Sequence, residues 1–266
     1  MTERLYLGLD IGAAFAKAVM IDESATAVGT AVMQSGIDFQ AAAAALQDTL
    51  HQTTGTGPAR IDRTVACGYG RRNVATADET KTEIACHAKG AHHFAKRACT
   101  VLDIGGQDSK VIRVNDNGDV RDFRMNRKCA AGTGAFVEEM ARRMGVPLET
   151  LSSLAEGATV PAPISAFCTV FAGTEILAAA RKGTPKAAIA LGIYVAVVER
   201  AMSLADLSGD VVLTGGLAAH HPVFERLLGD KLEGRLFRPP LPQYTGAWGA
   251  ALFARESGGR LPGEIR

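Results

Sequence analysis

Short apolar runs alternate with turn residues through the first third of the chain. The first run, residues 5–9, stops at Asp10-Ile11-Gly12, and an alanine-rich stretch with helical spacing follows three such runs. The expected elements are β-strands at 5–9, 17–21, 26–33 and 63–67 and helices at 39–52 and about 79–96. Three meandering strands before a helix predict an α/β fold.

The opening pattern returns in the middle of the chain. Residues 100–106 repeat the strand, aspartate and glycine of residues 7–12, and Asn117-Gly118 marks the turn of a second hairpin. Two strand–Asp–Gly–hairpin segments about ninety residues apart indicate a duplicated architecture. The remaining expected elements are strands at 110–114, 120–125, 210–214 and 235–237 and helices at 135–144, 171–181, 185–207, 223–233 and 243–255.

Composition narrows the class of protein. The 266 residues suffice for one large or two medium domains, and the net charge of +1 argues against nucleic acid or an anionic membrane as a partner. The N-terminus has no signal-peptide pattern and no run of eighteen apolar residues occurs, so a cytoplasmic protein is expected. Five unevenly spaced cysteines do not indicate a disulfide framework, and Cys67, Cys86 and Cys99 are expected to be buried thiols.

Two cysteines have similar surroundings. Cys129 lies in a loop of small residues before a predicted helix with Thr133 as its N-cap, and Cys168 also precedes a predicted helix. A helix N-terminus stabilises a thiolate. The pair is therefore interpreted as ligands for an anionic group, with two small core residues as the alternative.

Glycine turns follow three of the predicted strands. Neither a Walker P-loop nor a Rossmann fingerprint is present; instead Asp10 and Asp103 each begin an Asp-x-Gly turn, and a third turn is 214–216. Such turns let backbone N–H groups approach phosphate oxygens, and an aspartate at a strand end can hold Mg²⁺ through its waters.

These strings resemble a known superfamily of ATPases and, more specifically, one family of ATPases. Residues 8–12, 102–108 and 214–216 are similar to the phosphate-1, phosphate-2 and adenosine motifs of the actin/hexokinase/Hsp70 superfamily. Four longer strings resemble the BadF/BadG/BcrA/BcrD ATPase family, namely 68–71, 126–134, 168–172 and 243–251. The resemblance spans about residues 5–255 and implies duplicated RNase-H-like (actin-like ATPase) lobes, 1–98 and 99–266, around an ATP cleft.

The family resemblance also implies a cofactor and partners. One [4Fe–4S] cluster would be held by Cys129 and Cys168 from each subunit of a dimer, and since a cubane needs four thiolates, two per chain agree with a two-fold axis. The implied activity is ATP-driven delivery of low-potential electrons, taken from a ferredoxin or flavodoxin, to a CoA-thioester reductase or dehydratase component.

Roles follow for individual residues. Asp10 and Asp103 are expected to position Mg²⁺ and its waters, and Gln107 either orients the attacking water or is a polar turn residue. Lys17 is a candidate for reaching a phosphate, with a surface lysine as the alternative. The other expected ATP/ADP-binding residues are Gly12, Ala13, Ala14, Gly105, Gly106, Gly132, Thr133, Gly215, Gly216 and Gln243. His220 and His221 are expected at the surface.

Two adjacent residues depart from the family pattern. Ala13-Ala14 replaces the usual Ser-Thr and removes two hydroxyls that could contact phosphate or the metal shell, so nucleotide binding is expected to persist while hydrolysis is slower or lost. A weakened site fits a heterodimer with a paralogous ATPase subunit, as in benzoyl-CoA reductases, somewhat better than a homodimeric dehydratase activator. Two alternatives are a small-molecule (sugar or acyl) kinase of the same superfamily and a non-hydrolysing structural partner.

Overall fold

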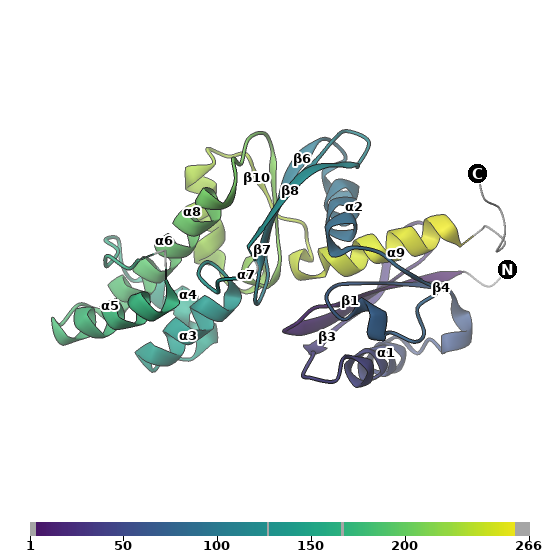
Figure 1. The fold of residues 1–266 in the computed structure, drawn as a ribbon, viewed down its shortest axis with the longest axis horizontal. Helices are drawn as coiled ribbons and strands as arrows, with labels where there is room; N and C mark the ends of the chain where they lie inside the picture. Colours follow the sequence, from purple (N-terminus) through teal and green to yellow (C-terminus); the bar gives the residue numbers. More distant parts are fainter. Residues whose placement is uncertain (1–3, 127, 166–167, 259–266) are drawn as a thin grey trace. The chain divides into compact units, whose positions relative to one another are not determined.

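The chain forms two compact α/β units. The structure, a computed structural model, describes residues 4–126, 128–165 and 168–258. The first unit comprises described residues 4–98, 114–120 and 244–258, and the second comprises the described residues of 99–113 and 121–243. Each contains one five-stranded sheet, so the expected α/β class and the duplication are confirmed (Figure 1).

The first unit builds its sheet in the order β3-β2-β1-β4-β5. Helix α1 packs on one face, and α9 packs on the other beside α2 (Figure 1). The elements are β1 (Leu5–Ile11), β2 (Phe15–Ile21), β3 (Ala27–Gln34), α1 (Phe39–Thr54), η1 (Pro58–Arg60), β4 (Ile61–Cys67), η2 (Arg71–Asn73), β5 (Glu79–Thr80), α2 (Glu83–Ala95) and α9 (Thr245–Ser257).

Strand β1 is the centre of this unit. All seven of its residues are buried, as expected for a strand that is covered on both faces. It pairs antiparallel with β2 and parallel with β4, and the register sets Asp10 opposite Lys17 on one side and Cys67 on the other. The carboxyl end of β1 therefore gathers an aspartate, a lysine and a thiol.

Three glycines let α9 approach this core closely. A Cβ atom at Gly8 would overlap the carbonyl oxygen of Ala247, and one at Gly249 would overlap that of Cys86. A Cβ atom at Gly90 would likewise overlap the carbonyl oxygen of Thr245. The backbones of β1, α2 and α9 thus meet without intervening side chains.

The packing of α9 makes the two units of the structure differ from the two parts expected from the sequence. The expected parts were 1–98 and 99–266, which assigned the last helix to the second part. In the structure α9 belongs to the first unit because of its contacts with β1 and α2. Residues 1–3 and 259–266 of the two expected parts lie outside the described residues.

The second unit builds its sheet in the order β10-β9-β6-β7-β8. Its core joins residues of β6 and β7 with the buried faces of the surrounding helices. The elements are β6 (Cys99–Ile104), β7 (Ser109–Val114), β8 (Val120–Asn126), α3 (Gly134–Met144), α4 (Leu148–Glu156), α5 (Thr169–Arg181), α6 (Lys186–Leu204), β9 (Val211–Thr214), α7 (Gly216–His220), α8 (Pro222–Lys231), β10 (Leu236–Phe237) and η3 (Pro242–Tyr244).

One predicted helix is shorter in the structure, and one short helix was not predicted. Of the helix expected at 79–96, Glu79 and Thr80 instead pair with β4, and the Thr82 side chain caps α2 by accepting a hydrogen bond from Ala85 N. The helix expected at 223–233 is α8, which begins with Pro222 and is preceded by the separate short α7. Helix α6 is long and apolar enough to cross a membrane by length and composition, but just over half of that window is buried in the unit, as in a core helix.

A buried polar pair lies among the helices of the second unit. The Tyr194 hydroxyl and His221 Nδ1 share a hydrogen bond of 2.7 Å, and both side chains are buried. The expectation that His221 lies at the surface is therefore wrong; His220 alone is exposed. Burial, together with the nearby His220, lowers the pKa of His221 to about 4.

The pKa of His221 predicts a loss of stability in acid. The unfolded chain takes up a proton near pH 6.5, whereas folded His221 resists protonation down to about pH 4. The free energy of unfolding should therefore fall by up to about 3 kcal/mol as the pH decreases from 6.5 to 4. Urea unfolding of the wild type and of His221→Gln at several pH values would measure it. Equal pH slopes for the two proteins would contradict the prediction.

Candidate functional site

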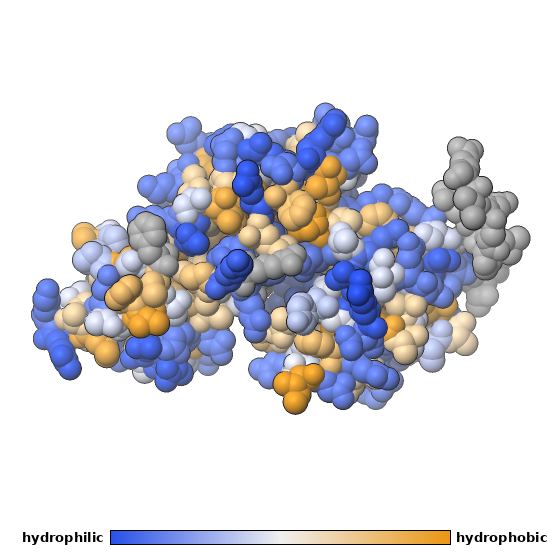
Figure 2. Space-filling model, viewed as in Figure 1, coloured by the Kyte–Doolittle hydropathy of each residue, from blue (hydrophilic) through white to orange (hydrophobic). Residues whose placement is uncertain are grey.

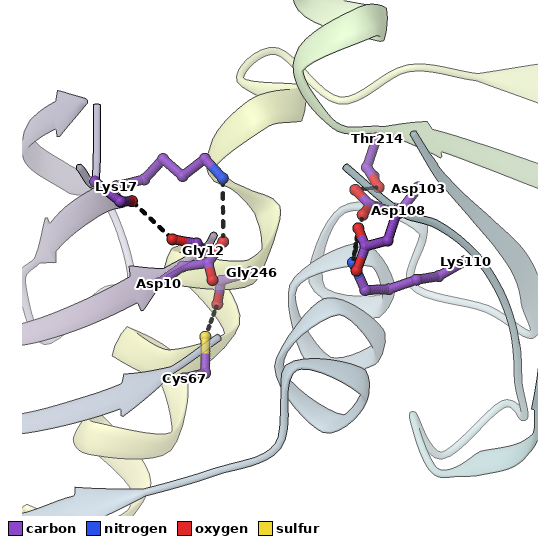
Figure 3. A network of polar contacts seen from close by, with 10 residues as sticks. Asp10, Gly12, Lys17, Cys67, Asp103, Asp108, Lys110, Thr214 and Gly246 are labelled. Atoms are coloured by element: carbon purple, nitrogen blue, oxygen red, sulfur yellow. Dashed lines mark hydrogen bonds and ion pairs between the residues drawn. The ribbon is translucent and has the colours of Figure 1, made fainter. Parts of the chain in front are cut away.

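The first candidate site surrounds Asp10 at the end of β1. Its side chain is buried, and its Oδ2 atom lies 3.5 Å from Nζ of Lys17 on the adjacent strand (Figure 3). Because the antiparallel register sets these two residues opposite each other, the hairpin itself returns the lysine to the aspartate. Lys17 is thus oriented inward, toward Asp10, at this edge of the sheet.

Two backbone segments enclose the Asp10 carboxylate. A Cβ atom at Gly68 would lie 2.5 Å from Asp10 Oδ1, and one at Gly246 would lie 3.1 Å from Oδ2. Gly68 also has a positive φ of 86°, which favours glycine. The sequence strings 68–71 and 243–251 contained these residues, but only the fold shows that both contact the same carboxylate.

A thiol lies behind this carboxylate. The Cys67 thiol donates to Gly246 O at 3.6 Å (Figure 3). A hydrogen bond with Cys86, burial and the nearby charge of Asp10 raise the pKa of Cys67 well above its ordinary value, which keeps it protonated. Cys67, Cys86 and Cys99 are all buried, so the prediction of buried thiols is confirmed.

The turn after β1 contains Ala13-Ala14, where the chain departs from the family pattern. Gly12 N donates to Phe15 O, which closes the turn, and Ala13 and Ala14 are half-buried in it. Ser35, directly after β3, supports the turn, because its hydroxyl donates to Gly12 O at 2.7 Å and its N–H donates to Ala14 O at 3.0 Å. Sequence reasoning missed Ser35, since it lies more than twenty positions from the turn along the chain.

The second candidate site surrounds Asp103 at the end of β6. Asp103 is 2% exposed, and it accepts from Thr214 Oγ1 at 2.8 Å and lies 3.3 Å from Lys110 Nζ (Figure 3). Lys110 also lies 2.8 Å from Asp108 Oδ1. The three ionised side chains together carry one net negative charge, which favours a hydrated Mg²⁺ ion.

Lys110 was not singled out from the sequence, although a signal for it exists. Asp103 and Lys110 are seven positions apart, and so are Asp10 and Lys17. The repeated hairpin therefore carries the same aspartate–lysine pair in each unit. The spacing within the repeat would have identified Lys110.

The glycine turns of the second unit meet at the same sheet edge. Gly105 N donates to Asp108 O at 2.9 Å, and Gln107 is exposed on this turn. Gly215 has a φ of 97°, and a Cβ atom there would overlap Ile104 O at the end of β6. Gly216 begins α7, and the Gln243 side chain shares a hydrogen bond of 2.9 Å with His220 at its end. Gly105, Gly106 and Gly215 are thus gathered around Asp103.

The two candidate ligand cysteines differ from the other three. Cys129 and Cys168 are half-buried, and Cys168 is the N-cap residue of α5. Thr133 is the N-cap residue of α3, but its hydroxyl donates to Ala130 O at 2.6 Å instead of capping the helix. The partial exposure of both thiols and their positions before helices fit a thiolate-ligated cluster. Residues 127, 166 and 167 of these strings lie outside the described residues.

A duplicated α/β fold with an aspartate, a lysine and a glycine turn at the end of each leading strand defines an ATPase of the actin-like fold. The sequence model of the BadF/BadG/BcrA/BcrD ATPase family matches residues 7–254. The chain belongs to that family, as its motifs predicted.

Similarity to individual proteins extends over nearly the whole chain. An activator of lactoyl-CoA dehydratase from Anaerotignum propionicum is 42% identical over 254 residues, which cover 94% of this chain and 97% of the relative. The solved structure of the activator of the 2-hydroxyisocaproyl-CoA dehydratase from Clostridium difficile, with bound ADPNP, matches with a TM-score of 0.90 and 32% identity over 98% of both chains. One of the subunits of benzoyl-CoA reductase from Thauera aromatica is 32% identical over 175 residues, covering 63% of this chain and 62% of the relative.

The paired lysines predict unequal effects on stability. Lys110→Met leaves two carboxylates without their shared cation in a buried site, which should lower the free energy of unfolding by about 3 kcal/mol. Lys17→Met is the matched control, because Lys17 has the same place in the repeat but one longer, partly exposed contact, and about 1 kcal/mol is expected. Denaturant unfolding without nucleotide or Mg²⁺ would compare them. An equal loss in both variants would contradict the assigned difference in burial.

Proposed function

We propose that this chain is an ATP-dependent electron-transfer subunit that activates a 2-hydroxyacyl-CoA dehydratase. The observation that carries the proposal is the combination, within one unit, of a phosphate-type turn at Asp103 and two half-buried cysteines, Cys129 in the loop before α3 and Cys168 as the N-cap residue of α5. A cytoplasmic location is part of the proposal.

Cys129 and Cys168 are the residues that would hold a [4Fe–4S] cluster. When bound, such a cluster supplies a one-electron carrier whose potential depends on hydrogen bonding and exposure. Among the described residues, no group of three or more His, Cys, Asp or Glu side chains is arranged to hold a metal ion. Two cysteines per chain support a cluster completed by a second subunit.

The surface near Cys168 supports a dimer. Val170 and Phe171 are 66% and 68% exposed, and Leu177 on the same helix is also exposed. Figure 2 shows apolar side chains gathered over the region of α5 on the visible face. A second subunit, identical or paralogous, would cover these side chains while it supplies two further thiolates.

The two aspartates would act at the phosphate end of ATP. Within each unit the aspartate, Asp10 or Asp103, would orient waters of Mg²⁺, while the lysine paired with it, Lys17 or Lys110, limits the negative charge beside it. Gln107, exposed on its turn, is the candidate for orienting the attacking water. The glycine turns would supply backbone N–H groups to ATP or ADP, and Gly132, Thr133 and Gln243 remain proposed contacts.

The extent of the match to two relatives supports a dehydratase component as the partner. On the sequence alone, Ala13-Ala14 favours the benzoyl-CoA reductase system. The lactoyl-CoA dehydratase activator matches at higher identity over 97% of its length, against 62% for the reductase relative, and this supports a dehydratase component as the electron acceptor. A ferredoxin or flavodoxin is proposed as the electron donor.

A small-molecule kinase would need a different aspartate. Its substrate hydroxyl requires a carboxylate base in a substrate pocket. Among the described residues the buried aspartates are Asp10 and Asp103, and each is paired with a lysine at a glycine turn. Both buried aspartates are thus paired with lysines at phosphate-type turns, which supports the ATPase over the kinase.

The iron content tests the electron-transfer function. Anaerobically purified protein should contain about two irons per chain, one shared cubane per dimer, with a broad visible absorption. Cys129→Ser and Cys168→Ser should each lose the iron, while Cys99→Ser, which changes a buried cysteine, should keep it. Iron-free wild type that dimerises and hydrolyses ATP would reject the proposal. Iron that appears only after co-expression of a paralogue would indicate a heterodimer.

Restoring the hydroxyls tests the effect of Ala13-Ala14. Ala13→Ser/Ala14→Thr should raise the ATP turnover number up to about thirtyfold, because each of the two new hydrogen bonds in the transition state contributes about 1 kcal/mol. Ala44→Ser on the exposed face of α1 is the control substitution. Steady-state ATPase assays with a separate measurement of ADP affinity would separate turnover from binding. Unchanged turnover would show that backbone groups suffice at this turn.

A further inference from the structure

Three hydrogen bonds join the turn after Asp103 to the segment that carries Cys129. Gly134 N donates to Gly105 O at 2.9 Å, and Ala135 N donates to Gly106 O at 2.8 Å. The third bond runs from Ser109 Oγ to Gly132 O at 3.0 Å. The first two use only backbone atoms, so the Ser109 bond is the one that a side-chain substitution removes.

Ser109 is held firmly on the side of the turn. It is the first residue of β7 and is 4% exposed. Its neighbours in the chain, Asp108 and Lys110, form the 2.8 Å ion pair beside Asp103. Any shift of this ion pair when Mg²⁺ and phosphate approach Asp103 would therefore act on the backbone of Ser109.

Gly132 is held firmly on the side of the cysteine. It is buried with a φ of 80°, and a Cβ atom there would overlap the Arg200 side chain of α6. Arg200 therefore lies close against the Gly132 backbone on the α6 side, and on the other side the Gly132 carbonyl accepts from Ser109.

The segment between Gly132 and Cys129 is stiffened by its own hydrogen bonds. Thr133 N and Oγ1 both donate to Ala130 O, at 3.0 and 2.6 Å. Asn126 Nδ2 donates to Cys129 O at 2.9 Å. A displacement of Gly132 is consequently passed to the backbone of Cys129, which is three residues away.

We propose that Ser109 is a positioning residue that transmits the state of the phosphate turn to the Cys129 loop. The inference deepens the proposed function, since it names the contact through which bound nucleotide alters the surroundings of a ligand cysteine. Ser109 touches neither phosphate nor thiolate in this role. It acts through Gly132.

Hydrogen–deuterium exchange on the full chain tests this role without relying on iron. In the wild type, saturating ADPNP with Mg²⁺ should slow amide exchange in residues 129–137 by about tenfold. In Ser109→Ala this nucleotide-dependent difference should fall below about twofold, while the slowing in residues 10–17 remains. Ser203→Ala is the matched control, because its hydroxyl also donates to a backbone carbonyl, Arg200 O at 2.9 Å, at an exposed position.

The remaining outcomes also decide the question. Full nucleotide-dependent protection of residues 129–137 in Ser109→Ala would overturn the inference, and so would loss of ADPNP binding, which would place Ser109 in the binding site itself. Ser109→Thr keeps the hydroxyl and should keep the difference; its loss there would attribute the effect to side-chain volume and reject the role. If the alanine variant does not fold, Ser109→Cys, with its weaker hydrogen bond, carries the same expectation.

Failure of this inference is distinguishable from failure of the proposed function. Iron-free protein that still shows Ser109-dependent exchange would reject electron transfer and support the coupling. Iron-containing protein whose exchange is unaffected by Ser109→Ala would support electron transfer and reject the coupling.

Discussion

The buried aspartate at the end of each leading strand is the constraint on which both units depend. An ionised carboxylate in a protein interior is tolerated when a cation and hydrogen-bond donors surround it. The hairpin that follows each strand supplies the cation, because it returns a lysine seven positions later to the same sheet edge. Around Asp10, Gly68 and Gly246 follow from the same need, since a Cβ atom at either position would press on the carboxylate.

The phosphate-type turn and the cysteine loop of the second unit belong to one hydrogen-bonded assembly. Helix α3 begins on the carbonyl groups of Gly105 and Gly106, so the helix that follows Cys129 is anchored on the turn that follows Asp103. A protein that couples hydrolysis to redox chemistry needs such a connection, and here it is short. The proposed activity therefore requires no long-range pathway between these two parts of the unit.

Much of this organisation could be predicted from the sequence, because strand periodicity and repeated Asp-x-Gly turns are local signals. The hairpins, the buried cysteines and the family were identified in this way. What sequence reasoning missed depends on contacts between distant segments: Gly68 and Gly246 against Asp10, Ser35 behind Gly12, and the burial of His221 beside Tyr194. The spacing of residues within each segment does not predict any of these contacts.

The close approach of α9 to β1 and α2 has a consequence for biosynthesis. The sheet of the first unit is covered on one side by α9, which follows every segment of the second unit along the chain and is synthesised after them. The backbone at Gly8 and Gly90 stays uncovered until residues Thr245–Ser257 have been synthesised and α9 packs on it. The first unit can therefore complete its core only after the second unit, whose segments all precede α9, has been synthesised.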